Sequence, residues 1–279
     1  MRDSIKNPPL KKFPSRIYGV DFSGAAKAGK KIWISSGIIE GGALKIDDCF
    51  PGTMLPDSGI DRDRCLIALM NFIARKRDSA FGLDFPFGLP RRLFHENSWE
   101  EFILSFPDKY QNQDIFRDIC YKLAGNSEIK RVTDKENLTP FSPYNLRLYK
   151  QTYFGIRVVL HPLVRNHLAC VLPMQRIKLG KPWILEVCPA STLKKENLYS
   201  PYKNKRHKKV REHILKEIEA KGILSIQSSL IRSEIVDGDE GNALDSIIAA
   251  FATFRALLNP SHLFVKKDSI YALEGYVFV

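Results

Sequence analysis

The sequence has few cysteines, and none are spaced as in a disulfide framework or a structural zinc site. Its five cysteines fall at positions 49, 65, 120, 170 and 188, so no two form a Cys-x-x-Cys pair. An odd number of widely spaced thiols argues against a disulfide scaffold and against a zinc knuckle. All of them but Cys49 have apolar neighbours, which predicts buried thiols in a reducing compartment.

Long apolar runs are also lacking. No run reaches the roughly 18–20 residues that a membrane-spanning helix needs. The first 15 residues, MRDSIKNPPLKKFPS, are polar and basic and contain no apolar segment of the secretory kind. We therefore expect no membrane association, a cytoplasmic location and a flexible basic tail at residues 1–15.

Several catalytic motifs are missing as well. The sequence contains no Gly-x-Ser-x-Gly elbow of a serine hydrolase, no phosphate-binding loop of the Gly-x-x-x-x-Gly-Lys-Ser/Thr kind and no His-x-x-x-His pair. The glycines near Gly24 and Gly29 do not form a dinucleotide-binding fingerprint. These absences leave the carboxylates and the basic residues as the candidates for chemistry.

Positive charge is present in excess. The 279 residues include 43 lysines and arginines against 31 aspartates and glutamates, a net charge of +12, within an ordinary globular composition. A positive field attracts phosphate groups, so nucleic acid is the expected partner. Many basic proteins bind no nucleic acid, so charge alone supports this expectation only modestly.

The order of elements predicts an α/β fold. The first three strands follow one another without a helix, as in an antiparallel meander. A helix over residues 61–77 precedes the fourth strand, so the fourth should lie parallel to the first. Residues 241–258 form an almost wholly apolar helical pattern, which predicts a buried helix. Strands are expected at residues 16–22, 31–39, 44–50, 80–85 and 183–187.

We therefore expect one domain over residues 16–279, with a mixed five-stranded sheet in the order β-β-β-α-β-α-β-α. Residues 91–181 should form a helical insertion between strands four and five. Its helical patterns cover 98–106, 112–124 and 145–169, and a linker follows at 172–181. We also expect a basic amphipathic helix over 207–220, and a closing strand or hairpin over 269–279 around Glu274-Gly275.

Four carboxylates occupy unusual places. Asp21 and Asp84 end strands one and four, Glu186 lies inside strand five, and Asp245 lies inside the apolar helix. A charged group in an apolar element is costly unless it is paired or binds a cation. Parallel strands one and four would bring Asp21 and Asp84 to one sheet edge, which Glu186 and Asp245 could join. Such a cluster would repel itself without a divalent cation, and oxygen ligands favour Mg²⁺ or Mn²⁺.

Each of these acids also has an ordinary explanation. Asp21 could form the turn that continues into Ser23-Gly24, and Glu186 could pair with an arginine of the insertion. Asp245 could lie on a surface. Asp84 is the least easily explained, because it has no helix to cap. The joint pattern, rather than any single residue, favours a site.

Basic residues form a second set of candidates. Arg91 and Arg92 follow the Asp84 loop, and residues 203–209 with Arg211 form the densest basic run. Tyr199 and Tyr202 lie nearby, so this run could follow a nucleic-acid backbone. A solvated helix start is the alternative. The residues expected to contact substrate are Ser23, Arg91, Arg92, Lys205, Arg206, Lys208 and Lys209.

Five short motifs resemble a known family. In order they are YGVDFSGA, GLDFPFGLP, EVCPASTL, NALDSIIAAFAT and EGYVF, and together they run from Tyr18 to Phe278. They resemble the domain of unknown function 429, whose members are predicted RNase H-like nucleases. The segment NLRLYKQTYFGIRVVLHPL resembles one subgroup of that family.

The resemblance implies an RNase H-like fold with metal ligands at Asp21, Asp84 and Asp245, and Glu186 as a further candidate. One feature departs from the family pattern. Relatives often carry an acid three residues before the helix aspartate, where this chain has Asn242. The acids at positions 239 and 240 could substitute for it, so the number of metal ions stays open.

These features together predict a metal-dependent nuclease with catalytic carboxylates at Asp21, Asp84, Glu186 and Asp245. The alternative is a nucleic-acid-binding or scaffold protein of the same fold without turnover. A nucleotide-binding protein of the actin-like or sugar-kinase type is a third hypothesis. Those folds need a duplicated domain with a second Gly-rich phosphate loop, and the sequence shows no second copy.

Overall fold

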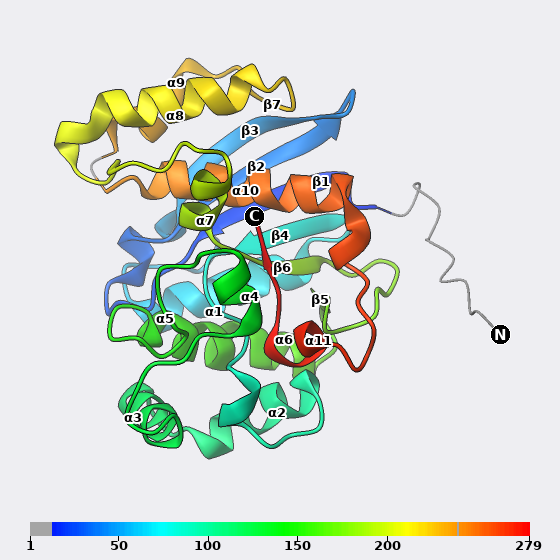
Figure 1. Ribbon diagram of the computed structural model, residues 1–279. Coiled ribbons are helices and arrows are strands. Elements are labelled where there is room, and N and C mark those ends of the chain that lie inside the picture. Colours follow the sequence, from blue (N-terminus) through cyan, green and yellow to red (C-terminus); the bar gives the residue numbers. More distant parts are fainter. Residues whose placement is uncertain (1–12, 239) are drawn as a thin grey trace.

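The computed structural model describes residues 13–238 and 240–279, which form an α/β fold around one mixed eight-stranded sheet (Figure 1). The strand order is β5-β6-β4-β1-β2-β3-β7, and β8 pairs with β6. The strands are β1 (Arg16–Asp21), β2 (Trp33–Glu40), β3 (Ala43–Pro51), β4 (Ser79–Leu83), β5 (Cys170–Leu172), β6 (Trp183–Val187), β7 (Leu224–Ile226) and β8 (Val277–Phe278).

The central pairing agrees with the sequence. Strands β1, β2 and β3 form an antiparallel meander, and β4 lies parallel to β1 with β6 beside it. The prediction of five strands is wrong, because β5, β7 and β8 add three strands of two or three residues each. Strands this short carry no alternation that a sequence pattern can reveal. The closing hairpin is also wrong, because the chain forms a short helix and then β8, which runs parallel to β6.

Helices cover both faces of the sheet (Figure 1). The helix α10 begins at residue 242 and crosses β1 and β2 on one face, together with α7, α8 and α9. The other face packs against α1 and the insertion. The helices are α1 (Arg62–Arg75), α2 (Trp99–Lys109), α3 (Gln113–Leu123), α4 (Val132–Glu136), α5 (Tyr149–Phe154), α6 (His161–Arg165), α7 (Pro189–Lys195), α8 (Lys208–Ala220), α9 (Ser229–Asp237), α10 (Asn242–Leu258) and α11 (Ile270–Glu274).

The insertion is helical as expected, but broken into shorter pieces. A π-helical segment, Gly155–Leu160, joins α5 to α6, so the predicted helix over 145–169 is irregular. The π segment contacts α1, and aromatic side chains of α2 and α3 belong to the same core as Tyr18 and Phe81 of the sheet. The insertion is therefore packed onto the sheet.

The end of the predicted basic tail contacts the rest of the protein. The ring of Phe13 packs edge-on against Trp183, with 5.3 Å between ring centroids. The Ser15 hydroxyl donates a hydrogen bond to Asp78, at 2.7 Å. The first 12 residues of that predicted tail lie outside the described residues.

None of the helices in the described part of the chain is by itself long and apolar enough to cross a membrane. The helices α9 and α10 meet the length and composition criteria only when they are taken together as a bent pair.

Candidate functional site

Two glycines allow α10 to lie unusually close to the sheet. Gly19 of β1 and Gly82 of β4 are paired across the parallel ladder. A Cβ on Gly19 would lie 2.0 Å from the carbonyl oxygen of Ser246, and one on Gly82 would lie 2.0 Å from the hydroxyl of Thr253. Contacts this short are impossible for a side chain, so only glycine lets α10 pack at this distance.

Alternation along the two strands then directs the predicted acids toward α10. In β1, Ile17 and Gly19 face α10 while Tyr18 and Val20 face the opposite core. Side chains two residues apart share a face, so Asp21 follows Gly19 toward α10, and Asp84 likewise follows Gly82 just beyond the end of β4.

The helix α10 supplies the third acid from its first turn. Asp245 is 1% exposed and Asp21 is 7% exposed. All three carboxylates line one cavity of about 490 Å³ at the end of the sheet. We call Asp21, Asp84 and Asp245 the acid site; the structure brings together the three residues that the sequence grouped as metal ligands.

Asp245 has partners for both of its carboxylate oxygens. The Tyr202 hydroxyl donates to one oxygen at 2.6 Å, and the Lys203 ammonium lies 2.7 Å from the other. The Lys203 side chain is 60% exposed, so its ammonium reaches the acid from the open side. The neighbouring acids raise the pKa of Lys203 above its ordinary value, Asp245 first and then Asp21. This lysine is therefore a built-in counter-ion of the acid site.

A buried arginine fixes the loop that carries Tyr202 and Lys203. Arg211 of α8 is 1% exposed, and its guanidinium donates to the backbone carbonyls of Tyr202, Asn204 and Val236 at 2.7–2.8 Å. The sequence placed Arg211 in an exposed basic run. In the structure it instead ties the loop to the end of α9.

The other two acids have no such partners. Within residues 13–238 and 240–279, neither Asp21 nor Asp84 accepts a hydrogen bond through its carboxylate. Burial raises the pKa of Asp21 well above its ordinary value, and the charge of Asp245 adds to the effect. Burial, reinforced by Asp245, raises the pKa of Asp84 to about 8. These carboxylates are therefore held where a cation would stabilise their charged forms.

Asp84→Asn is expected to stabilise the metal-free protein, and more so at high pH. A folded-state pKa of about 8 lies above the unfolded value near 4, so the folded state holds the proton more tightly between the two. Wild-type stability therefore falls as pH rises from about 4 to about 8, and asparagine removes this loss. Thermal unfolding in EDTA should show a gain of about 1–3 kcal/mol at pH 9 and a smaller one at pH 5. A gain independent of pH would contradict the assignment.

Glu186 does not join the acid site. Trp183, Leu185 and Val187 of β6 face the α10 side, so alternation turns Glu186 toward the insertion. Its carboxylate accepts the Phe87 backbone N–H at 2.9 Å and forms an ion pair with Arg131. The alternative prediction, that Glu186 pairs with an arginine of the insertion, is confirmed. Glu186 lies in the wall of the cavity with its oxygens already engaged.

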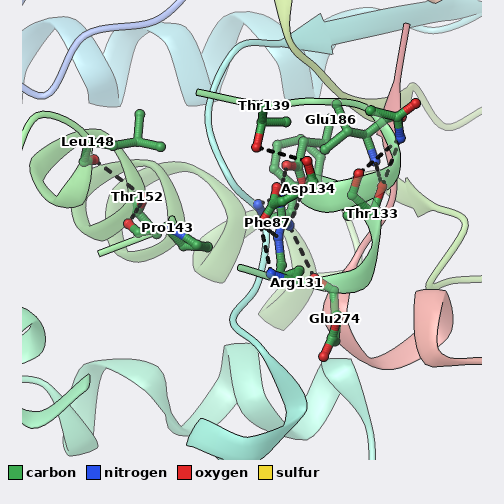
Figure 2. Close-up of polar contacts among 12 residues, drawn as sticks. Phe87, Arg131, Thr133, Asp134, Thr139, Pro143, Leu148, Thr152, Glu186 and Glu274 are labelled. Atoms are coloured by element: carbon green, nitrogen blue, oxygen red, sulfur yellow. Dashed lines mark hydrogen bonds and ion pairs between the residues drawn. The ribbon is translucent and has the colours of Figure 1, made fainter. Parts of the chain in front are cut away.

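Arg131 is the centre of a buried ionic network (Figure 2). It donates to Asp134 through two nitrogens at 2.8 and 3.0 Å, to Glu186 at 2.8 Å and to the Glu274 carbonyl at 3.2 Å. A second contact to Glu186 completes the use of its five N–H groups. The Glu274 carboxylate accepts the backbone N–H groups of Arg91 and Val132. The network thus joins the insertion, β6 and the C-terminal segment.

The arginines expected beside Asp84 are committed elsewhere. The Arg91 guanidinium donates to the carbonyls of Phe94 and Glu96 at 3.0 and 2.9 Å and lies over the Phe94 ring. Arg92 is exposed. Neither residue lines the cavity at the acid site.

Of the predicted basic run, Lys203 lines that cavity, and residues 204–209 lie outside its lining, in the turn before α8 and at its start. Lys208 pairs with Asp237 at 2.6 Å, while Arg206 and Lys209 are exposed. Lys205 belongs to the short turn before α8. The run is a surface feature next to the Lys203 loop.

Ser23 lies in a second, smaller cavity of about 290 Å³, which Asp21 also lines. Glu240 also lines it and pairs with Lys31 at 2.9 Å, which lowers the pKa of Glu240. Glu240 does not line the larger cavity, and its carboxylate accepts a hydrogen bond from the Asn242 side-chain amide. The other proposed substitute for the missing acid, at position 239, lies outside the described residues.

Nucleophilic side chains other than the acids are few here. Cys188 lines the larger cavity, but burial raises its pKa to about 12, so it is a thiol at neutral pH. A protonated thiol is a weak nucleophile. No histidine is among the described residues that line either cavity. The carboxylates are therefore the groups at this site best suited to bind a cation.

The donor set has the chemistry of a magnesium or manganese site, since it offers carboxylate oxygens that are buried or half-buried and, at Asp21 and Asp84, accept no hydrogen bond from the described residues. Over the described residues, however, no three acid, histidine or cysteine groups are close enough to hold an ion as they stand. The oxygens of Asp245 are taken by Tyr202 and Lys203. A metal ion would have to displace the Lys203 ammonium.

The sequence analysis did not name Arg147 or Gln151, and it placed Tyr202 and Lys203 at the basic run without predicting their contacts with Asp245. Tyr202 and Lys203 lie in a loop with no periodicity, where nothing indicates which side chains turn inward. Arg147 and Gln151 line both cavities. Their only signal is their place in the insertion motif NLRLYKQTYFGIRVVLHPL.

Comparison with protein-family models, with curated proteins and with solved structures finds no match to this chain at significance.

Proposed function

We propose that this protein is a divalent-metal-dependent nuclease, which hydrolyses phosphodiester bonds of nucleic acid at the acid site. One observation carries the proposal: Asp21 is 7% exposed, accepts no hydrogen bond from the described residues, and lines both cavities. A buried, unpaired carboxylate is costly to keep without a role. Binding a cation that enters through the cavity is the role that fits this carboxylate.

The metal ion proposed here is Mg²⁺ or Mn²⁺, held by Asp21, Asp84 and Asp245. When bound, it would supply Lewis-acid polarisation of a phosphoryl oxygen and lower the pKa of a bound water. The acid site would orient the reacting phosphate, and Lys203 and Arg147 would offset its negative charge. Glu186 has no part in this proposal, because Arg131 already neutralises it.

The reaction itself is a hydrolysis. The oxygen of a water molecule bonds to phosphorus, and the bond from phosphorus to the leaving sugar oxygen breaks. The water gives up a proton, and the leaving oxygen takes one up. No oxidant or reductant is needed.

The sheet supports an RNase H-like assignment as part of the same proposal. Its middle strands run in the order β6-β4-β1-β2-β3 with β2 antiparallel, and the acids lie where β1 and β4 end. The motif resemblance to the domain of unknown function 429 points to the same fold. Ligands of open α/β sheets bind beyond the carboxyl ends of the strands, which is where the larger cavity lies.

The proposal is tested by a nuclease assay with Mg²⁺ or Mn²⁺ on RNA, DNA and hybrid substrates. Asp84→Asn is expected to lower the rate by about 10²-fold or more, as loss of one preorganised charge-stabilising group does in other enzymes. The matched control is Asp118→Asn, an exposed aspartate of α3. Equal rates for wild type and Asp84→Asn would reject the proposal.

A second candidate is a nucleic-acid-binding protein of this fold without turnover. The observation that favours it is the Lys203 ammonium, which pairs with Asp245 at 2.7 Å. This candidate requires binding that survives Asp84→Asn but weakens uniformly when Lys205, Arg206, Lys208 and Lys209 are replaced by alanine. Unchanged affinity in the alanine variant would reject it.

A further inference from the structure

The two cavities at the acid site meet at shared residues. Asp21, Arg147, Gln151 and Lys203 line both of them. A ligand group at Asp21 therefore borders both pockets. The larger cavity, about 490 Å³, lies toward α4 and the loop over 139–148, and the smaller, about 290 Å³, lies toward Ser23.

The larger cavity carries aromatic rings. Phe141 is partly exposed and Tyr199 is 52% exposed, and both line this cavity. A cation lies over each ring: the Arg147 guanidinium is 5.6 Å from the centre of Phe141, and the Lys194 ammonium is 5.3 Å from the centre of Tyr199. Exposed rings beside basic groups are what nucleobases stack upon, while the cations attract the phosphates.

The smaller cavity is basic. Lys31, Lys150, Arg147 and Lys203 line it, with Asp21 and Glu240 as its acids. Lys31 is paired with Glu240 and Lys203 with Asp245, which leaves Arg147 and Lys150 as two further cations in the lining of the pocket. A phosphate leaving the acid site in this direction would find an electropositive surface.

The size of the larger cavity limits what can enter. A volume of about 490 Å³ belongs to the range of small-ligand pockets. An unpaired base can be splayed out of a single strand into such a pocket, whereas a base held in a stacked duplex cannot. The insertion forms the wall with Phe141 and Arg147, so it decides what the site accepts.

We propose that the substrate is single-stranded nucleic acid, bound with one unpaired base in the larger cavity against Phe141 and Tyr199. The next phosphodiester lies at the acid site, and the following phosphate lies in the smaller cavity. The position of the cleaved bond rests on the proposed nuclease function. The preference for an unpaired base does not rest on that function, because it follows from the shape and chemistry of the cavities alone.

The test measures binding without turnover. Fluorescence anisotropy in EDTA at fixed salt compares a labelled eight-nucleotide single strand with a blunt duplex containing the same sequence. The single strand is expected to bind more tightly. Phe141→Ala and Tyr199→Ala should each weaken that binding by about 5- to 150-fold, the cost of losing one base–ring stack, and leave duplex binding unchanged.

The control variant is Leu230→Ala, an exposed residue of α9 that lines neither cavity. Circular dichroism and the melting temperature confirm that each variant is folded. Equal or tighter binding of the duplex overturns the proposal, as does wild-type affinity in both aromatic variants. A free nucleoside monophosphate that competes at the same concentration as the octanucleotide shows that the ligand is a mononucleotide, which also overturns it.

These outcomes separate the two proposals. If Asp84→Asn leaves the nuclease rate unchanged but the single-strand preference depends on Phe141 and Tyr199, the nuclease function fails and the binding inference stands. If the protein cleaves duplex in a manner that Asp84→Asn abolishes, and the aromatic variants bind like wild type, the function stands and the inference fails.

Discussion

Replacing Arg131 with methionine is expected to lower the free energy of unfolding by about 3–5 kcal/mol. The side chains of Arg131, Asp134 and Glu186 are all at least 97% buried, so the substitution leaves two carboxylates in the interior without their counter-ion. Methionine has a similar length and leaves little cavity. At roughly 2–4 °C per kcal/mol for a domain of this size, the melting temperature should fall by about 6–20 °C.

The control for this variant is Lys135→Met, an exposed lysine of α4, the helix that Arg131 precedes, and it should change stability by no more than about 0.5 kcal/mol. Should Arg131→Met fail to fold, Arg131→Lys provides the measurement, since it keeps the charge but loses the five-donor fork. We expect Arg131→Lys to lower the free energy of unfolding by an amount between those of Arg131→Met and Lys135→Met. Equal urea midpoints for Arg131→Met and Lys135→Met would show that the network contributes nothing to stability.

Replacing Lys203 with methionine is expected to tighten Mn²⁺ binding by about tenfold or more. The ammonium lies 2.7 Å from Asp245 and competes with any other cation there. Its attraction to the acids also raises its pKa, so it stays charged at neutral pH and must be displaced for a metal ion to enter. Calorimetric titration of the metal-free protein with MnCl₂ measures the difference, and each tenfold corresponds to about 1.4 kcal/mol.

Lys203→Met should lower the stability of the metal-free protein and raise that of the Mn²⁺-bound protein. In EDTA its melting temperature should lie below that of wild type, because the acid site has lost its counter-ion. Saturating Mn²⁺ should more than restore it, because a ligand that binds the folded state stabilises that state. Lys216→Met, an exposed residue of α8, controls for the change of net charge. Equal Mn²⁺ affinities for Lys203→Met and wild type would show that the Lys203 ammonium does not compete with the metal ion for Asp245.

The sequence was sufficient for the parts of the site that regular elements carry. The parallel pairing expected for the first and fourth strands, together with the apolar run of α10, predicted the convergence of Asp21, Asp84 and Asp245. Glu186 escaped the same logic because β6 is apolar on both faces, so its pattern does not reveal which face each residue takes. Only the register against β4, which pairs Leu83 with Glu186, decides it.

The loops and the buried arginines could not be predicted. Tyr202 and Lys203 owe their positions to carbonyl contacts with Arg211, which lies in a run that is otherwise basic and exposed. A sequence does not mark which arginine of such a run turns inward, since burial of a guanidinium depends on acceptors from distant segments. Arg131 is the same case, with acceptors from β6 and the C-terminal segment.

The contact between α10 and the paired glycines has a consequence for how this protein can evolve. The distance between α10 and the two strands, and with it the separation of the carboxylates, depends on Gly19 and Gly82, which have no Cβ atom. A change of chemistry in the cavity can therefore arise from a methyl group added in the core, with no change in any residue that a ligand touches. Selection on activity would therefore act on these two glycines as well as on the acids.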